Sequence, residues 1–225
     1  MKPNNFKLLK MVLLLAGIIL SCSEKKPEEP CICEEEPVYS KPCICEGDMD
    51  DDGQNYFMYY GGEKMFFEVS ATKMVVMSES FDTTVIKKIL ACKLRIIMIL
   101  HPRQFLIEIE SESKAELLCL QKQWNKKEGI IYTSPVFIDE VGKEIAALTN
   151  EVIIKLKNAA DYSLLTKNAA AYQIEHIIPR ALNELSYLLI LEHGSLKNAM
   201  QTANELYETG LYDYVEPDLI HFNIF

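Results

Sequence analysis

The sequence predicts an α+β fold in which the order β-α-β-β-α-β occurs twice. Three observations lead to this prediction. Short apolar runs of strand length are bounded by turn residues, segments with apolar residues at helical spacing lie between them, and Ser, Asp or Gly stands at the segment borders. The chain has 225 residues, of which 49% are apolar and 25% charged, so it can bury one large core or two small ones.

The first half, residues 56–149, is expected to form one such unit. Asp82 is expected to cap its first helix and Ser113 its second, while His101-Pro102 turns the strand pair between them. The expected elements are strand runs at 64–69 and 73–77, a helix from 82 to about 92, strands at 94–100 and 104–110, a helix at 113–127 and a strand at 130–138.

The second half, residues 150–225, repeats this order. The expected elements are a strand at 151–156, a helix at 160–171, strands at 174–180 and 186–192, a helix at 196–209 and a strand from 212. The last helix has one apolar face, with Ser195 as the expected N-cap and Gly210 as the C′ residue. Two tandem ferredoxin-like units with antiparallel sheets are therefore predicted.

The amino terminus has the pattern of a secretory signal in residues 1–21. Three lysines precede a ten-residue apolar stretch, 11–20, which is shorter than the roughly 20 residues needed for a membrane anchor, the alternative interpretation. Ile19-Leu20-Ser21-Cys22 resembles a bacterial lipobox, in which the cysteine is acylated. We therefore expect a lipid-anchored protein of the cell envelope, on the outer membrane, attached through Cys22.

The charge balance argues against nucleic acid as a partner. The formal net charge is −10, and removal of residues 1–21 would leave 20 basic against 33 acidic side chains. Such a surface repels polyanions, so the acyl group is expected to be the membrane attachment.

Residues 22–55 are rich in proline and acid, which predicts an extended tether. Pro-Cys-Ile-Cys-Glu occurs in it twice, at 30–34 and 42–46. Its four cysteines, Cys31, Cys33, Cys43 and Cys45, could bind a soft metal, form disulfides or stay as thiols. Outside the tether, Cys92 and Cys119 lie among apolar residues on helical segments, which predicts buried inert thiols.

No cofactor is expected from the remaining motifs. Asp48–Gly53 begins like an EF-hand calcium loop, but its twelfth position is Tyr59 rather than Glu, which favours a solvated acidic linker. The segment His193-Gly194-Ser195 resembles the His-Gly-Thr of subtilisin-like proteases. The other parts of such an active site are missing from the sequence, so no triad and no enzymatic activity are expected.

The most specific segment is Leu206–Asp218, which ends in Tyr-Val-Glu-Pro-Asp. It resembles the end of the inhibitory propeptide of subtilisin-like serine proteases, especially pro-regions of Bacteroidetes, and Tyr59–Lys64 resembles their upstream part. The resemblance implies a β-α-β-β-α-β fold for about residues 150–225. Because the chain ends seven residues after Asp218, we expect a free-standing relative of the propeptide rather than a protease.

In that family the propeptide sheet packs on two protease helices, and acidic residues cap their amino termini. The resemblance gives this role to Glu216 and Asp218, although both could also be ordinary solvated residues, and Pro217 between them indicates a bend or an edge strand. The tail that the resemblance places in the protease cleft is Leu219, Ile220, His221, Phe222, Asn223, Ile224 and Phe225. Ile224 or Phe225 would approach the specificity pocket.

Three functions are compatible with these patterns. The first is a lipid-anchored propeptide-like protein that inhibits a subtilisin-like protease or assists its folding. The second is a non-inhibitory surface scaffold, or the orphan of a truncated protease. The third is a metal-responsive lipoprotein that uses the four tether cysteines.

Overall fold

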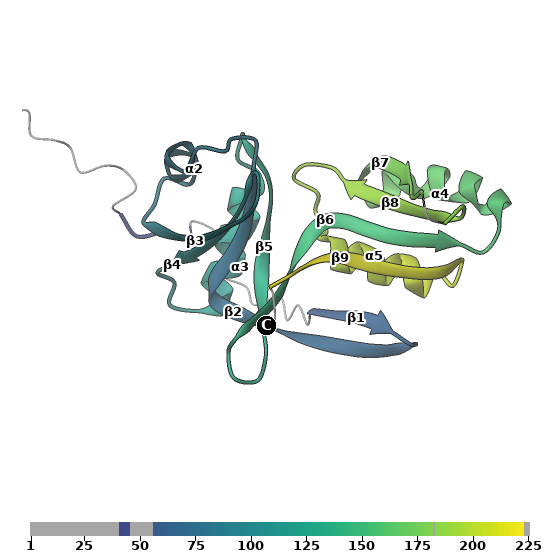
Figure 1. Ribbon diagram of the computed structural model, residues 1–225, viewed down its shortest axis with the longest axis horizontal. Helices are drawn as coiled ribbons and strands as arrows, with labels where there is room; N and C mark the ends of the chain where they lie inside the picture. Colours follow the sequence, from purple (N-terminus) through teal and green to yellow (C-terminus); the bar gives the residue numbers. More distant parts are fainter. Residues whose placement is uncertain (1–40, 46–55, 182, 223–225) are drawn as a thin grey trace, which may run out of the picture. The chain divides into compact units, whose positions relative to one another are not determined.

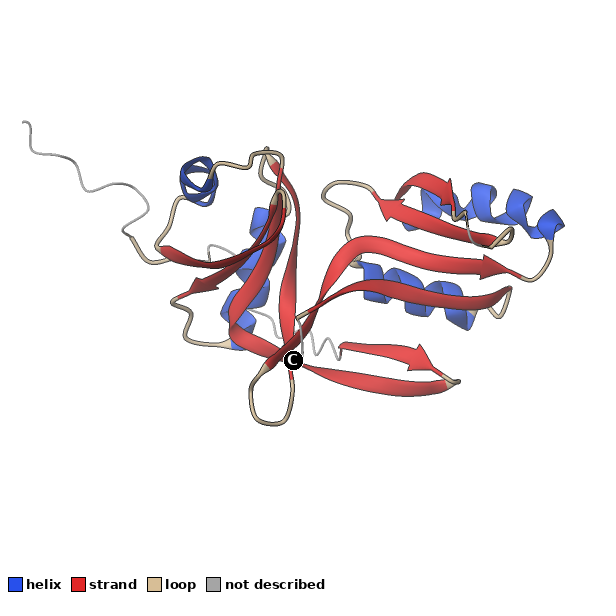
Figure 2. Ribbon diagram, viewed as in Figure 1, coloured by secondary structure: helices blue, strands red, loops and turns tan. Residues whose placement is uncertain are grey.

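The computed structural model describes residues 41–45, 56–181 and 183–222, which all belong to one compact unit beginning at Pro37. In this part of the chain, nine strands form a curled antiparallel sheet accompanied by four α-helices (Figure 2). The mixed α+β class is therefore as predicted. Residues 1–21, where a secretory signal is predicted, Cys22 and the acidic segment Asp48–Gly53 lie outside the described residues.

The first half contains five strands and two helices (Figure 1). These are β1 Tyr56–Tyr60, β2 Glu63–Ser78, α2 Thr83–Leu90, β3 Leu94–His101, β4 Gln104–Ile109, α3 Lys114–Trp124 and β5 Ile130–Ile138. The strands pair in the order β3-β4-β2-β5, and β1 pairs with β2. The two runs predicted at 64–69 and 73–77 are one strand, β2, with an irregular register between Val69 and Met74.

The second half contains four strands, two helices and two 3-10 turns. These are β6 Glu144–Leu156, a turn at Ala159–Asp161, α4 Tyr162–Asn168, a turn at Ala169–Tyr172, β7 Ile174–Pro179, β8 Ser186–Leu191, α5 Ala199–Glu208 and β9 Tyr212–His221. Strand β6 pairs with β5, β8 and β9, and β8 pairs with β7. The predicted border between residues 149 and 150 falls inside β6, which links the two halves.

Capping residues fix the helix ends. As predicted, the Asp82 side chain accepts the Thr84 N–H and the Ser113 hydroxyl accepts the Glu116 N–H. The predicted cap of the last helix was wrong, because α5 begins three residues later. There Asn198 and Gln201 form a reciprocal capping box, while the Ser195 hydroxyl donates to Gln173 at 3.2 Å.

The β1–β2 hairpin was not predicted. Its turn, Gly61-Gly62, has φ values of +59° and +90°, which favour glycine over residues with a side chain. The hairpin lies against α5, where the Tyr59 ring stacks on Tyr207 at 4.3 Å and the Tyr59 hydroxyl donates to Glu208 at 2.7 Å. Through these contacts the first half of the chain packs on the last helix.

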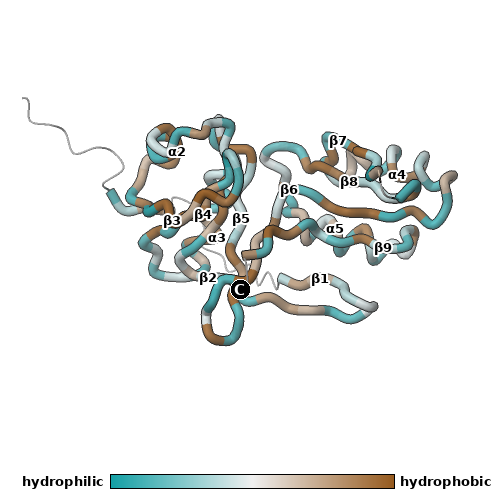
Figure 3. Tube along the Cα trace, viewed as in Figure 1, coloured by the Kyte–Doolittle hydropathy of each residue, from teal (hydrophilic) through white to brown (hydrophobic). Residues whose placement is uncertain are grey.

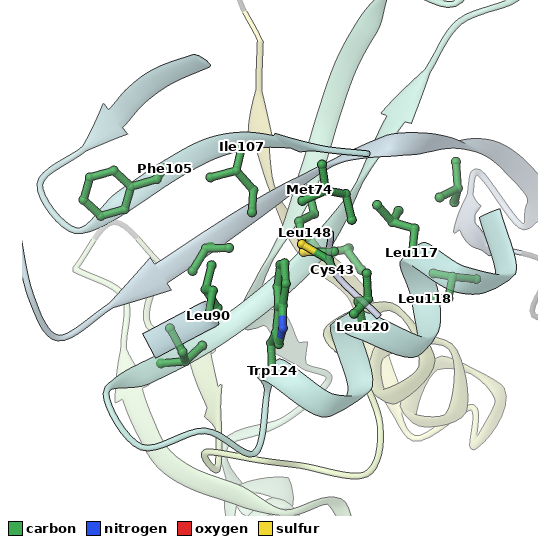
Figure 4. Packing of buried hydrophobic residues seen from close by; sticks show 14 of the residues in the cluster. Cys43, Met74, Leu90, Phe105, Ile107, Leu117, Leu118, Leu120, Trp124 and Leu148 are labelled. Atoms are coloured by element: carbon green, nitrogen blue, oxygen red, sulfur yellow. The ribbon is translucent and has the colours of Figure 1, made fainter. Parts of the chain in front are cut away.

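The largest core lies between the first-half sheet and helices α2 and α3 (Figure 4). Trp124 and Leu120 of α3 pack there on Met74 of β2 and Phe105 of β4, all at most 2% exposed. A second core lies between the second-half strands and helices α4 and α5, with Leu165 and Leu206 fully buried. Apolar residues of β6 take part in both cores, and Figure 3 shows brown along part of that strand.

The first-half sheet is also buried on the face opposite its helices. Val75, Tyr132 and Val136 form a third cluster there with Leu106 and Ala147. Ile220 and Phe222, from the end of β9 and the residue after it, pack on this cluster. The described carboxyl-terminal residues are therefore part of the packed fold.

Two disulfides fasten the second Cys-x-Cys pair to the core. Cys43 is bonded to Cys92, directly after α2, and Cys45 is bonded to Cys119 in α3. The prediction of inert thiols at Cys92 and Cys119 was therefore wrong, and so was a free tether at residues 41–45. Cys43 and Cys45 are not available as thiolate ligands, which contradicts a metal site built on all four tether cysteines. Cys31 and Cys33 lie outside the described residues.

Candidate functional site

The second-half sheet has one face that no described helix covers. On β6, Val152, Ile154 and Leu156 belong to the core that contains α4 and α5. Because side chains alternate along a strand, the residues between them point to the opposite side. We call this side the open face. It consists of Glu151, Ile153 and Lys155 of β6, His176 and Ile178 of β7, Leu188 and Ile190 of β8, and Tyr214, Glu216 and Asp218 of β9.

The open face has an apolar centre with charged groups along its β9 side. Ile153 lies opposite Leu188 on one side and opposite Glu216 on the other. Ile153, Leu188 and Ile190 are only partly buried, and Ile178 is 44% exposed. A partly exposed apolar surface rimmed by charge is typical of a protein-binding site.

The two acids that the sequence singled out both point to this face. Asp218 accepts a hydrogen bond from the Thr149 hydroxyl at 3.2 Å, where β6 and β9 shift register. Glu216 pairs with Ile153 in the sheet and is partly exposed. The structure thus brings Glu216 and Asp218 together on one surface, separated by Pro217, whose own position is buried on the helix side.

A third carboxylate lies beside them. Burial raises the pKa of Glu151, and the nearby charge of Asp218 raises that pKa further. Burial also raises the pKa of Tyr132 on β5, with smaller contributions from the charges of Glu151 and Asp218. Negative charge is therefore concentrated where the open face meets the third cluster.

Replacing Glu151 with glutamine is expected to stabilise the fold at pH 7. The folded-state pKa of Glu151 lies above its ordinary value of 4.5, so wild-type stability rises as the pH falls through the window just above 4.5. The advantage of Glu151→Gln should therefore disappear near pH 4. Because the side chain is only partly buried, solvent screens the effect and the gain is expected to be under about 1 kcal/mol.

Urea unfolding at pH 7 and pH 4 measures this difference. Glu184→Gln, at an exposed loop position, is the matched control and should change little at either pH. A destabilising effect of Glu151→Gln at pH 7 would contradict the prediction.

The first three residues of the predicted tail belong to β9, and the fourth is also bonded to β6. Leu219, Ile220 and His221 pair with Leu148, Ala147 and Ala146 of β6. The Phe222 N–H donates to the Ile145 carbonyl at 3.0 Å. Leu219–Phe222 are therefore bonded to β6, which begins earlier than predicted and supplies a partner strand. Asn223, Ile224 and Phe225 lie outside the described residues.

A cavity of about 210 Å³ lies elsewhere, between α3, β5 and the start of α5. Its floor is polar but satisfied internally. The Gln121 amide donates to the Thr133 carbonyl at 3.0 Å, and the Thr133 hydroxyl lies 2.8 Å from the Asn125 side-chain oxygen. The Ser134 hydroxyl accepts the Leu148 N–H. These groups therefore do not require a ligand.

Catalytic or metal-binding geometry is not seen in the described residues. The Ser195 hydroxyl is directed to Gln173 and His193 is exposed, so the two do not form a nucleophile and base pair. Within the described part of the chain, no group of three or more His, Cys, Asp or Glu side chains could hold a metal ion. None of the helices described is long and apolar enough to cross a membrane.

No protein-family model matches the chain, and no curated protein shows significant sequence similarity to it.

Sequence reasoning missed the apolar half of the open face. Ile153, Leu188 and Ile190 were included in expected strands, but which side of each strand would be covered by a helix was not assigned. The signal was present, since Val152, Ile154 and Leu156 alternate with Ile153 and Lys155. The more polar of the two alternating sets, which includes Ile153 and Lys155, lies on the face that no described helix covers.

Proposed function

We propose that this chain is a lipid-anchored, propeptide-like protein that binds a subtilisin-like serine protease through its open face, as an inhibitor or a folding chaperone. The observation that carries the proposal is the position of Glu216 and Asp218. Both lie on the open face, beside the apolar centre formed by Ile153, Leu188 and Ile190. This arrangement combines an apolar contact surface with two anions that could bind helix amino termini.

The pairing order supports a more specific fold assignment. In the second half the strands pair in the order β9-β6-β8-β7. The first and third strands of the unit, β6 and β8, therefore lie in the middle, and the fourth and second, β9 and β7, lie at the edges. The first half has the same order in β5-β2-β4-β3. We therefore assign two tandem ferredoxin-like units, of which the second corresponds to the propeptide.

The docking chemistry follows from helix termini. The first N–H groups of a helix have no partner within the helix and carry a partial positive charge. A carboxylate placed there gains hydrogen bonds and a favourable dipole interaction, typically about 0.3–1 kcal/mol and up to about 2 kcal/mol when partly buried. Glu216 and Asp218 are expected to make such contacts with two surface helices of the protease.

The proposed membrane attachment is the acylated Cys22, in the bacterial cell envelope of a Bacteroidetes-type organism. The disulfides support an oxidising compartment, because such bonds persist outside the cytosol. The acyl chain would hold the docking surface near secreted proteases without a spanning helix.

Neutralising both acids tests the proposal. We expect Glu216→Gln together with Asp218→Asn to weaken binding to active-site-blocked subtilisin by about 1–2 kcal/mol, roughly 5- to 30-fold in Kd. Surface plasmon resonance measures this change. The control is Glu128→Gln with Glu184→Gln, which removes two exposed loop charges and should bind like the wild type. Equal loss in both variants, or absence of wild-type binding, would refute the docking role.

A second candidate function is a non-inhibitory scaffold or the orphan of a truncated protease. One observation favours it: Leu219–Phe222 are bonded to β6, so they can enter a cleft only after leaving the sheet. Hydrolysis of a small peptide substrate by subtilisin separates the two functions. Inhibition at concentrations that saturate binding supports the inhibitor, whereas binding with full residual activity supports the scaffold.

A further inference from the structure

Strand β6 is irregular where it passes Asp218, one of the two acids on the open face. Leu148 and Val152 of β6 pair with the β9 residues on either side of Asp218. The three β6 residues 149–151 therefore lie opposite Asp218 alone. Such a β-bulge interrupts the ladder of main-chain hydrogen bonds and re-aims the side chains beside it. Asp218 thus lies at a place where ordinary strand pairing does not fix its surroundings.

The Thr149 hydroxyl connects the two strands at this bulge. Its oxygen accepts the Glu151 N–H at 3.1 Å, and it lies 3.2 Å from Oδ2 and 3.3 Å from the carbonyl oxygen of Asp218. A hydroxyl has one hydrogen to donate and two lone pairs that accept. Because a lone pair accepts the Glu151 N–H, the hydrogen is directed to Asp218. One hydroxyl therefore joins the main chain of β6 to the carboxylate on β9.

This contact acts against a repulsion between like charges. Burial and then the charge of Asp218 raise the pKa of Glu151, so the two carboxylates are close enough to interact. Without a compensating contact, each carboxylate would be better placed away from the other. The Thr149 hydroxyl provides that contact, since a hydrogen bond to an ionised carboxylate is stronger than one between neutral groups. Asp218 is therefore held at the bulge in spite of Glu151.

The bulge is itself fixed on both sides of Thr149. The Leu148 N–H donates to the Ser134 hydroxyl of β5 at 2.9 Å. The Asn150 side-chain amide donates to the Leu191 carbonyl of β8 at 3.4 Å. These bonds restrict the main chain before and after Thr149. The direction of its hydroxyl is consequently set by the sheet.

We propose that Thr149 is a positioning residue for protease docking, whose hydroxyl holds one carboxylate oxygen of Asp218 so that the other can accept N–H groups at a protease helix terminus. This inference rests on the proposed function. Among the described residues, the Asp218 carboxylate has no bonded partner other than Thr149. A side chain that is already held loses little conformational entropy on binding. Thr149 acts through Asp218 and does not itself need to touch the protease.

Removing the hydroxyl at nearly constant volume tests this role. We expect Thr149→Val to raise the Kd for active-site-blocked subtilisin about fivefold, because Asp218 must then be ordered during binding. Thr149→Ser restores the hydroxyl and should bind like the wild type. The matched control is Thr166→Val, which removes an exposed hydroxyl from α4, on the side of the sheet opposite the open face. It should also bind like the wild type.

Double variants separate positioning from a general structural effect. In an Asp218→Ala background, Thr149→Val should change the Kd no further, because the residue that it positions is gone. In a Glu216→Gln background, the same substitution should still raise the Kd about fivefold. Wild-type affinity of Thr149→Val would overturn the proposal. An equal loss of affinity with and without Asp218 would also overturn it.

Hydrogen exchange of the Glu151 amide in the protein alone distinguishes this inference from the proposed function. We expect this amide to exchange about tenfold faster in Thr149→Val than in the wild type or in Thr149→Ser, because its acceptor is lost. Fast exchange in the wild type would overturn the positioning role and leave the docking role of Asp218 standing. Slow wild-type exchange without binding to subtilisin would refute the proposed function, and the docking role of Thr149 with it.

Discussion

Replacing Cys43 and Cys92 together with serine is expected to lower the free energy of unfolding by about 2–4 kcal/mol. The bond closes a loop between residues 49 positions apart, and long loops lose the most entropy when they are cross-linked in the unfolded chain. Its Cys43 end is 3% exposed within the main core, so the serine hydroxyl would also be poorly solvated. Urea denaturation of the oxidised variant measures the change.

The duplicated motif provides a matched control for this experiment. Cys31→Ser with Cys33→Ser changes the first Pro-Cys-Ile-Cys-Glu and leaves both described disulfides intact. We expect this variant to unfold at the wild-type urea midpoint. If both variants lose stability equally, Cys92 would be bonded to the first motif instead.

Deleting residues 219–225 is expected to destabilise the fold by about 3 kcal/mol. The deletion removes the pairing of Leu219–His221 with β6 and the partly buried side chains of Leu219, Ile220 and Phe222. Each side chain would contribute about 1 kcal/mol, given 1.5–3 kcal/mol for full burial. Differential scanning calorimetry of the truncated and intact proteins measures the loss.

This deletion also changes how the protease experiment should be interpreted. A truncated protein that fails to inhibit could do so because β9 is weakened, even though Glu216 and Asp218 are still present. Asn223→Gly with Ile224→Gly and Phe225→Gly is the better test of cleft binding, since it leaves every described residue unchanged. Unchanged unfolding temperature on deletion from Leu219 would contradict the packing of this segment.

Local patterns predicted most of the elements. The apolar run at Ile130–Ile138 gave the bounds of β5, and the short polar side chains of Asp82 and Ser113 marked the starts of α2 and α3. These features depend on neighbours in sequence. Alternation and capping are therefore sufficient to place them.

Nonlocal contacts account for the errors. Strand β6 begins at Glu144 rather than at the predicted residue 151 because its start pairs with the end of β9, some seventy residues later in the chain. Disulfide partners were likewise not predictable, since Cys43 and Cys92 meet only when α2 packs on the sheet. The resemblance singled out Glu216 and Asp218, but the apolar centre beside them required the sheet order.

The two bonds from Cys43 and Cys45 have a mechanical consequence. Tension applied at the amino terminus reaches the sulfur bridges before it reaches Tyr56, where the first described strand begins. The load therefore enters through the end of α2 and the middle of α3, and the β1–β2 hairpin is not peeled from α5. Pulling from the amino-terminal side would therefore load covalent links before it loads β1.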